Sequence, residues 1–174
     1  STDQPKGKMV NVLFEPKAKL SDSLTYDITA WSLPYAHGFD AIASKTKVSS
    51  IESKTVKSIT NTIDKSAYAY ISKWNSLEDA TFLGALLQQN ITPRFSEKIF
   101  SLEGKTYDPG TLIILRNDNR TTDFDEKLNK IANKHQRKIQ PVATGFVDSG
   151  LDFGSYSVKP INKQKIALLS HPMK

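Results

Sequence analysis

One short pattern suggests phosphate chemistry. Gly104-Lys105-Thr106 matches the end of a phosphate-binding loop, in which backbone N–H groups and the lysine hold the phosphates. Such a loop begins with a glycine five residues earlier, and that place is taken by Ile99. The loop must also join a strand to a helix, whereas this triplet lies in a segment that predicts a β-hairpin. We therefore predict no phosphate-binding loop.

A second pattern suggests a metal pair. His37 and Asp40 have the spacing of two ligands on one helical face, but Gly38 between them is a helix-ending residue, and no third ligand is nearby. A histidine at a helix C-terminus is favoured by the helix dipole, which explains His37 and also His135. The sequence holds no cysteine, so thiolate metal sites, disulfides and cysteine nucleophiles are excluded. We assign no metal ligand and no catalytic residue.

Two acidic pairs have ordinary structural explanations. Asp123 with Asp125 stands at a predicted helix start, and Asp148 with Asp152 lies in a predicted loop, so capping and turn formation account for both. Neither the G-x-S-x-G turn of a serine hydrolase nor the G-x-G-x-x-G loop of a dinucleotide-binding domain occurs. A hydrolase whose site is not visible in the sequence stays open as an alternative.

Composition limits the partners. The chain has 174 residues, a net charge of +6 and a pI near 9.4, but its lysines are spread out rather than grouped with arginines, so we predict no nucleic-acid partner. No apolar run approaches the ~20 residues of a membrane-spanning helix. The chain starts at Ser1 without an initiator methionine or an apolar leader, and we therefore interpret it as a fragment of a longer protein.

Any functional site must be positioned by the secondary-structure elements, and the clearest of these lie in residues 67–119. A buried strand at 67–71 precedes a helix that starts with a capping box, Ser76 and Asp79, and a second strand at 91–95 follows it. We predict that these two strands are parallel neighbours joined by a right-handed crossover. The other expected elements are a hairpin turning at Glu103-Gly104, a central strand at 111–115, a helix at 122–135, and strands at 139–146 and 165–169.

This pattern predicts an α/β fold with an open, mostly parallel sheet flanked by helices and one β-hairpin insertion. Towards the N-terminus we expect a strand at 8–14, a helix at 26–38, a short strand at 39–43 and a surface excursion at 44–66. We divide the chain into a domain at 1–158 and a C-terminal strand at 159–174, which we interpret as the start of a following domain.

Polar and aromatic residues follow the predicted strands. In an open parallel sheet, ligands bind beyond the carboxyl ends of the strands, where these residues would gather. Ordinary turn and cap formation is the competing explanation. The candidate ligand-binding residues are Trp74, Asn75, Arg116, Asn117, Asp118 and Asp148.

Several longer segments resemble a known family. Residues 26–34, joined to Gln4-Pro5-Lys6-Gly7 and to Ala69-Tyr70-Ile71, look like the region after the catalytic domain in bacterial zinc carboxypeptidase-like proteins of the carboxypeptidase A superfamily. The hairpin at 100–110 with the strand after it, and residues 144–148 with 152–155, resemble the same region. That region is similar to class I glutamine amidotransferase-like domains, whose thiol chemistry needs a cysteine that this chain lacks.

The resemblance implies a non-catalytic accessory domain of a secreted or periplasmic metallopeptidase, a hydrolase. The zinc would be held in a separate upstream catalytic domain by an H-x-x-E pair and a later histidine, and this chain would need no cofactor of its own. Its partners would be neighbouring domains of the same polypeptide. The alternative is a small-ligand-binding α/β module with its site at the strand ends.

Overall fold

A computed structural model of the chain describes residues 13–14, 33–42, 44, 46 and 58–165. Contacts within the chain define two units. The first contains residues up to Ser58 together with Asn75–Ala80, and the second contains Ile59–Trp74 and the chain from Thr81 onward.

The second unit is built on a five-stranded antiparallel sheet. Its order is β6-β1-β5-β2-β7, and every neighbouring pair is antiparallel. The strands are β1 (Ala69–Ser72), β2 (Arg94–Ser96), β5 (Leu112–Leu115), β6 (Gln140–Val142) and β7 (Val158–Pro160).

Two helical crossovers connect these strands. Helix α3 (Leu77–Gln88) joins β1 to β2, and helix α4 (Phe124–Lys134) joins β5 to β6 after the short 3₁₀ helix η2 (Arg116–Asp118). Because β5 lies between β1 and β2, and β1 lies between β5 and β6, each crossover joins two parallel strands that are not neighbours. This is the split β-α-β arrangement, doubled, with β7 added at the edge next to β2.

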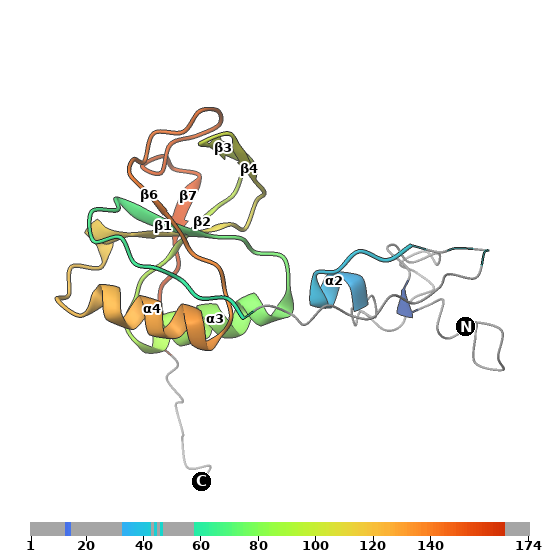
Figure 1. Cartoon of the computed structure of the whole chain (residues 1–174). Coiled ribbons are helices and arrows are strands. Elements are labelled where there is room, and N and C mark those ends of the chain that lie inside the picture. Colours follow the sequence, from blue (N-terminus) through green and yellow to red (C-terminus); the bar gives the residue numbers. More distant parts are fainter. Residues whose placement is uncertain (1–12, 15–32, 43, 45, 47–57, 166–174) are drawn as a thin grey trace, which may run out of the picture. The chain divides into compact units, whose positions relative to one another are not determined.

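The sheet is covered on both faces (Figure 1). Helices α3 and α4 lie on one side, where Phe82 and Leu86 of α3 and Leu128 of α4 pack with Tyr70 and Ile114 of the sheet. The opposite side carries a second two-stranded sheet, β3 (Phe100–Leu102) with β4 (Lys105–Tyr107), and the segment between β6 and β7.

The hairpin forms the second core. Its turn residues Glu103 and Gly104 have φ values of 52° and 69°, as a two-residue hairpin turn requires. The Phe100 ring stacks on Tyr107 at 5.0 Å between centroids and meets the edge of Phe153 at 5.6 Å. All three rings are buried, so the hairpin closes the face of the sheet that the helices leave open.

The predicted open, mostly parallel sheet is wrong. The two predicted strands at 67–71 and 91–95 do run parallel and are joined by a helix, but β5 separates them and pairs antiparallel with both. The error has a physical cause. Strands β1 and β5 are buried on both faces, which produces the continuous apolar runs that are typical of parallel sheets, and here the hairpin produces the same burial in an antiparallel sheet.

The predicted capping box at the start of α3 brings Ser76 and Asp79 together. The Asp79 carboxylate accepts hydrogen bonds from the backbone N–H groups of Ser76 at 2.8 Å and Asn75 at 2.9 Å. Asp79 is buried, so these bonds replace the water that the carboxylate loses. The Asp79 N–H donates to the Ser76 carbonyl at 3.1 Å, and the Ser76 hydroxyl donates to the Asp79 carboxylate at 3.2 Å.

In the first unit, helix α2 (Leu33–His37) is the described end of the predicted helix at 26–38. Gly38 follows it with φ +64°, as predicted, and a Cβ there would lie 2.5 Å from the Asn75 carbonyl oxygen. Residues 39–42 form no strand, contrary to prediction. The predicted strand at 8–14 lies outside the described residues except for its last two positions.

Residues 59–66 of the predicted excursion are anchored within the second unit through Asn61. Asn61 is buried, and its side-chain amide donates to the Arg137 carbonyl at 2.8 Å while its amide oxygen accepts from the Ile139 N–H at 2.9 Å. At the other end, β7 spans the predicted boundary between residues 158 and 159. The predicted strand at 165–169 lies outside the described residues apart from Lys165.

Candidate functional site

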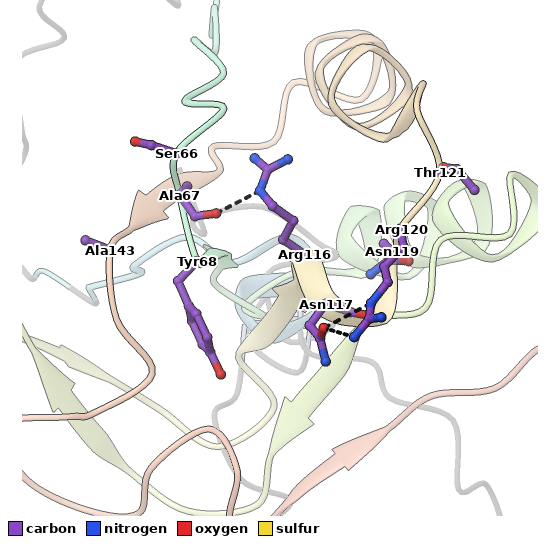
Figure 2. A pocket seen from close by; sticks show the side chains of 9 residues that line it. All are labelled: Ser66, Ala67, Tyr68, Arg116, Asn117, Asn119, Arg120, Thr121 and Ala143. Carbon is purple, nitrogen blue, oxygen red and sulfur yellow. Dashed lines mark hydrogen bonds between the residues drawn. The ribbon is translucent and has the colours of Figure 1, made fainter.

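A hollow of about 670 Å³ lies beyond the carboxyl ends of β5 and β6 (Figure 2). Its wall is formed by residues 66–68 before β1, Arg116 and Asn117 of η2, residues 119–121 and Ala143 after β6. Strands β5 and β6 are parallel to each other on either side of β1, so their carboxyl ends reach the same edge of the sheet. The hollow therefore lies where the strand-end prediction expected a ligand, although the sheet is antiparallel.

Arg116 stands at the centre of a network that joins three parts of the fold. Its Nε donates to the Ala67 carbonyl at 2.8 Å, and Nη2 donates to the Asp64 carbonyl at 3.0 Å. Nη1 and Nη2 bind the Asp125 carboxylate at 3.0 and 2.9 Å, and Nη2 also reaches the Tyr70 hydroxyl at 3.3 Å. The hydrogen bonds to Asp125 raise the pKa of Arg116 above its ordinary value. The guanidinium is thus engaged with the protein itself.

Asp118 is likewise engaged. Its carboxylate accepts two hydrogen bonds from Arg94 of β2, at 2.7 Å from Nε and 3.2 Å from Nη2. These bonds raise the pKa of Arg94. The buried Asn119 next to it mimics a strand, because its side-chain amide both accepts from the N–H of Thr92 at 2.7 Å and donates to the carbonyl of Thr92 at 3.1 Å. Both side chains fasten η2 to β2 and to the residues before it.

Asn117 holds the neighbouring arginine. The Nε of Arg120 donates to the Asn117 carbonyl at 3.1 Å and to its side-chain oxygen at 3.0 Å, and Arg120 Nη2 also contacts that oxygen. Both residues are exposed. Figure 2 shows this pair on the side of η2 away from the Arg116 guanidinium.

Tyr68 forms part of the opposite wall. Its ring points to the same side as the Asn117–Arg120 pair (Figure 2) and is 43% exposed. A Cβ on Gly145 would lie 2.6 Å from the Tyr68 Cε1, so the glycine leaves the space that the ring occupies. The sequence analysis did not select Tyr68 or Arg120. Their only signal was their position beside predicted strand ends.

The six predicted ligand-binding residues do not gather at one place. Arg116 and Asn117 line the hollow, and Asp118 is beside them. Trp74 lies at the other end of the sheet, because β1 runs antiparallel to β5 with Ala69 opposite Leu115 and Ser72 opposite Leu112, and the Trp74 side chain faces Gly110, before β5.

The last two predicted residues serve turns. Asn75 precedes α3, and its N–H donates to Asp79. Asp148 belongs to the layer on the hairpin side, where its carboxylate accepts from the Gly104 N–H at 3.1 Å and its own N–H donates to Ser101 at 2.8 Å. A mostly parallel sheet would have brought all six residues to one edge, and the antiparallel pairing separates them.

The patterns first examined for chemistry also have structural places. Gly104-Lys105-Thr106 lies in the β3–β4 hairpin, and the next element after the hairpin is strand β5 rather than a helix. The Nδ1 of His37 is 3.3 Å from a carboxylate oxygen of Glu78, and the ring of His135 lies 6.4 Å from that of Phe82. Within residues 58–165 and the other described positions, no three His, Asp or Glu side chains are grouped to hold a metal.

A second hollow, of about 400 Å³, lies between α3 and α4. Lys127, Lys130 and Lys134 of α4 line it together with Asp123 and Glu126, and Lys127 is paired with Asp123 at 2.7 Å. The sequence analysis identified α4 but not this groove, since a groove depends on how two helices pack. None of the helices in the described part of the chain is long and apolar enough to cross a membrane.

Comparisons with protein-family models, curated proteins and solved structures find no match to this chain. The resemblance to zinc carboxypeptidase-like proteins therefore stays a prediction.

Proposed function

We propose that this chain is a non-catalytic accessory domain that packs against a neighbouring catalytic domain, and that this neighbour is a zinc carboxypeptidase-like peptidase, as the sequence resemblance suggests. The observation that carries the proposal is that two ion pairs in and beside the wall of the main hollow hold parts of the fold together. Arg116 of η2 pairs with Asp125 of α4, and Arg94 of β2 pairs with Asp118 of η2. Catalytic acids and bases are instead placed within reach of a substrate in a cleft.

Exposed apolar side chains support a role in packing against another domain. Phe146 and Tyr156 are 77% and 78% exposed, and both belong to the segment between β6 and β7; Ile99, before β3, is 57% exposed. We call these three residues the apolar positions. Aromatic side chains are enriched at protein interfaces.

The segment between β6 and β7, which contains Phe146 and Tyr156, is held in place by a buried side chain and by hydrogen bonds within the segment. The Phe153 side chain is fully buried, and its N–H donates to the Gly145 carbonyl at 3.0 Å, while the Val147 N–H donates to the Asp152 carboxylate at 2.8 Å. An ordered segment presents its side chains with little loss of conformational entropy on binding, which favours association.

The proposal is tested by binding of this chain to the separately produced catalytic domain of the same polypeptide. Isothermal titration calorimetry should show association, and the double variant Phe146→Asp/Tyr156→Asp should weaken it by roughly tenfold or more, because buried aromatic contacts dominate interface energies. The control is Gln89→Asp/Asn90→Asp, which adds the same two charges at the exposed end of α3. Absence of association, or equal loss in both double variants, would contradict the proposal.

A second experiment addresses chemistry in the isolated chain. We expect it to show no peptidase activity and to retain no stoichiometric zinc after dialysis, since the resemblance places the zinc site in a separate domain. One equivalent of retained zinc, lost on His37→Ala, would show that this chain has a metal site of its own.

A further inference from the structure

The hollow beyond β5 and β6 has an uneven charge. Its wall contains two arginines, Arg116 and Arg120, and no acidic residue. The charge of Arg116 is balanced by Asp125 at 2.9 Å. Among the described residues, Arg120 has no carboxylate partner, because the residue that holds it is the neutral Asn117. The hollow thus carries one uncompensated cation.

The hydrogen bonds to Asn117 use only some of the N–H donors of the Arg120 guanidinium. Asn117 binds Nε and one side of Nη2, while Nη1 has no hydrogen-bond partner in the described part of the chain. A guanidinium that a neutral group holds in place keeps its full charge and loses less side-chain freedom when an anion binds. Its planar fork matches the two oxygens of a carboxylate or a phosphate.

Tyr68 supplies a flat surface on the same side of η2 (Figure 2). Its ring is partly exposed, and its hydroxyl has no hydrogen-bond partner among the described residues. Gly145 opens the space in which the ring lies. An aromatic face and a cation without a carboxylate partner, both in the wall of one hollow, favour a ligand that combines an anionic group with a flat apolar part.

We infer that this hollow is a binding site for a small organic anion, with its oxyanion group on Arg120 and its flat part against Tyr68. The volume, about 670 Å³, lies within the range of ligand sites. The site does not depend on the proposed packing against a peptidase domain, since neither Arg120 nor Tyr68 belongs to the apolar positions.

The experiment is a titration of the whole chain, followed by NMR, with benzoate and with inorganic phosphate as probes. Benzoate should shift the amide signals of Tyr68, Asn117, Arg120 and Ala143 before others. Arg120→Gln should weaken both probes by roughly tenfold, because a charge-assisted pair of hydrogen bonds is lost. The control Lys130→Gln removes the same charge between the two helices and should leave both affinities unchanged.

Three further variants distinguish the contribution of Tyr68 to binding from that of Arg120. Tyr68→Ala should weaken benzoate and leave phosphate unchanged, and Gly145→Ala should have the same effect because its methyl group displaces the ring. Arg120→Lys, which keeps the charge without the fork, should bind both probes more weakly than the wild type. The amide spectrum of each variant shows whether it is folded.

Several outcomes would contradict the inference of an anion-binding site. These are shifts that map elsewhere, an Arg120→Gln variant that binds as the wild type does, and a Lys130→Gln variant that loses as much affinity. Absence of binding at millimolar probe concentrations would overturn it equally. None of these results bears on the calorimetry with the catalytic domain, so the two proposals fail separately.

Discussion

Replacing Arg116 by methionine should destabilise the second unit far more than the same change at Arg94. Both arginines hold a carboxylate with two hydrogen bonds, and their side chains are similarly exposed, 31% for Arg116 and 25% for Arg94. The difference lies in the number of partners. Arg94 holds Asp118 alone, whereas Arg116 also holds the carbonyls of residues 64 and 67 and the Tyr70 hydroxyl.

The magnitude follows from these contacts. Arg116→Met removes five hydrogen bonds and leaves the Asp125 carboxylate, which is 21% exposed, partly paired with water. Each of the three bonds to an uncharged acceptor contributes roughly 0.5–1.5 kcal/mol and the partly exposed carboxylate pair about 0.5–1 kcal/mol, so the expected cost is about 2–5 kcal/mol. Arg94→Met breaks one partly exposed ion pair and should cost about 0.5–1 kcal/mol.

Denaturant unfolding measured by circular dichroism gives both free energies, and thermal melting gives a second measure. For a unit of this size, the Arg116 variant should melt roughly 10–20 °C below the wild type. Equal losses in the two variants would refute the reasoning, because they would show that the contacts of Arg116 beyond the carboxylate pair contribute nothing measurable.

Three further predictions concern stability. Asp79→Ala should cost about 1–2 kcal/mol in chemical denaturation, because it leaves the N–H groups at the start of α3 without their acceptor; an unchanged midpoint would contradict this. Asn61→Ala should cost about 2–3 kcal/mol and speed amide hydrogen exchange at Ile139, whose N–H loses its partner; exchange at the wild-type rate would show that the bond is dispensable. Burial raises the pKa of Tyr70 and of Tyr107 above the ordinary value of about 10. The unfolded chain therefore releases these protons first, so the contribution of the two tyrosines to stability should be constant up to about pH 10 and should fall as pH rises towards the folded pKa values, with Tyr70→Phe and Tyr107→Phe reducing that fall.

Much of the local structure was accessible from the sequence because its causes are local. The helix predicted at 122–135 corresponds to α4, in which the helically spaced apolar residues Phe124, Leu128, Ile131 and Ala132 are all buried. The carboxylate of Asp79 acts three residues from its partner, and the turn at Glu103-Gly104 depends on the conformations of two residues. Such features need only the chain within one or two turns of the residue concerned.

Only part of the candidate site could be predicted from the sequence, because its other contacts join residues that are distant in the chain. Arg116 and Asn117 were selected because they follow a strand, but the sequence could not show that Arg116 would be taken up by Asp125 and that Arg120 would remain free. Both outcomes depend on the direction in which each arginine side chain points. They also depend on the packing of α4 and of the segment after β6 at this edge of the sheet.

The sequence by itself determined which segments of residues 67–142 become strands and helices, since apolar periodicity and turn residues act over short distances. Only the tertiary structure decided the direction and order of the strands, because burial on both faces gives β1 and β5 the same apolar pattern in a parallel or an antiparallel sheet. The β3–β4 hairpin covers the second face of the sheet, so the antiparallel strands β1 and β5 are buried on both faces. The antiparallel order then placed Trp74 and Arg116 at opposite ends of the sheet and left the hollow between Tyr68 and Arg120.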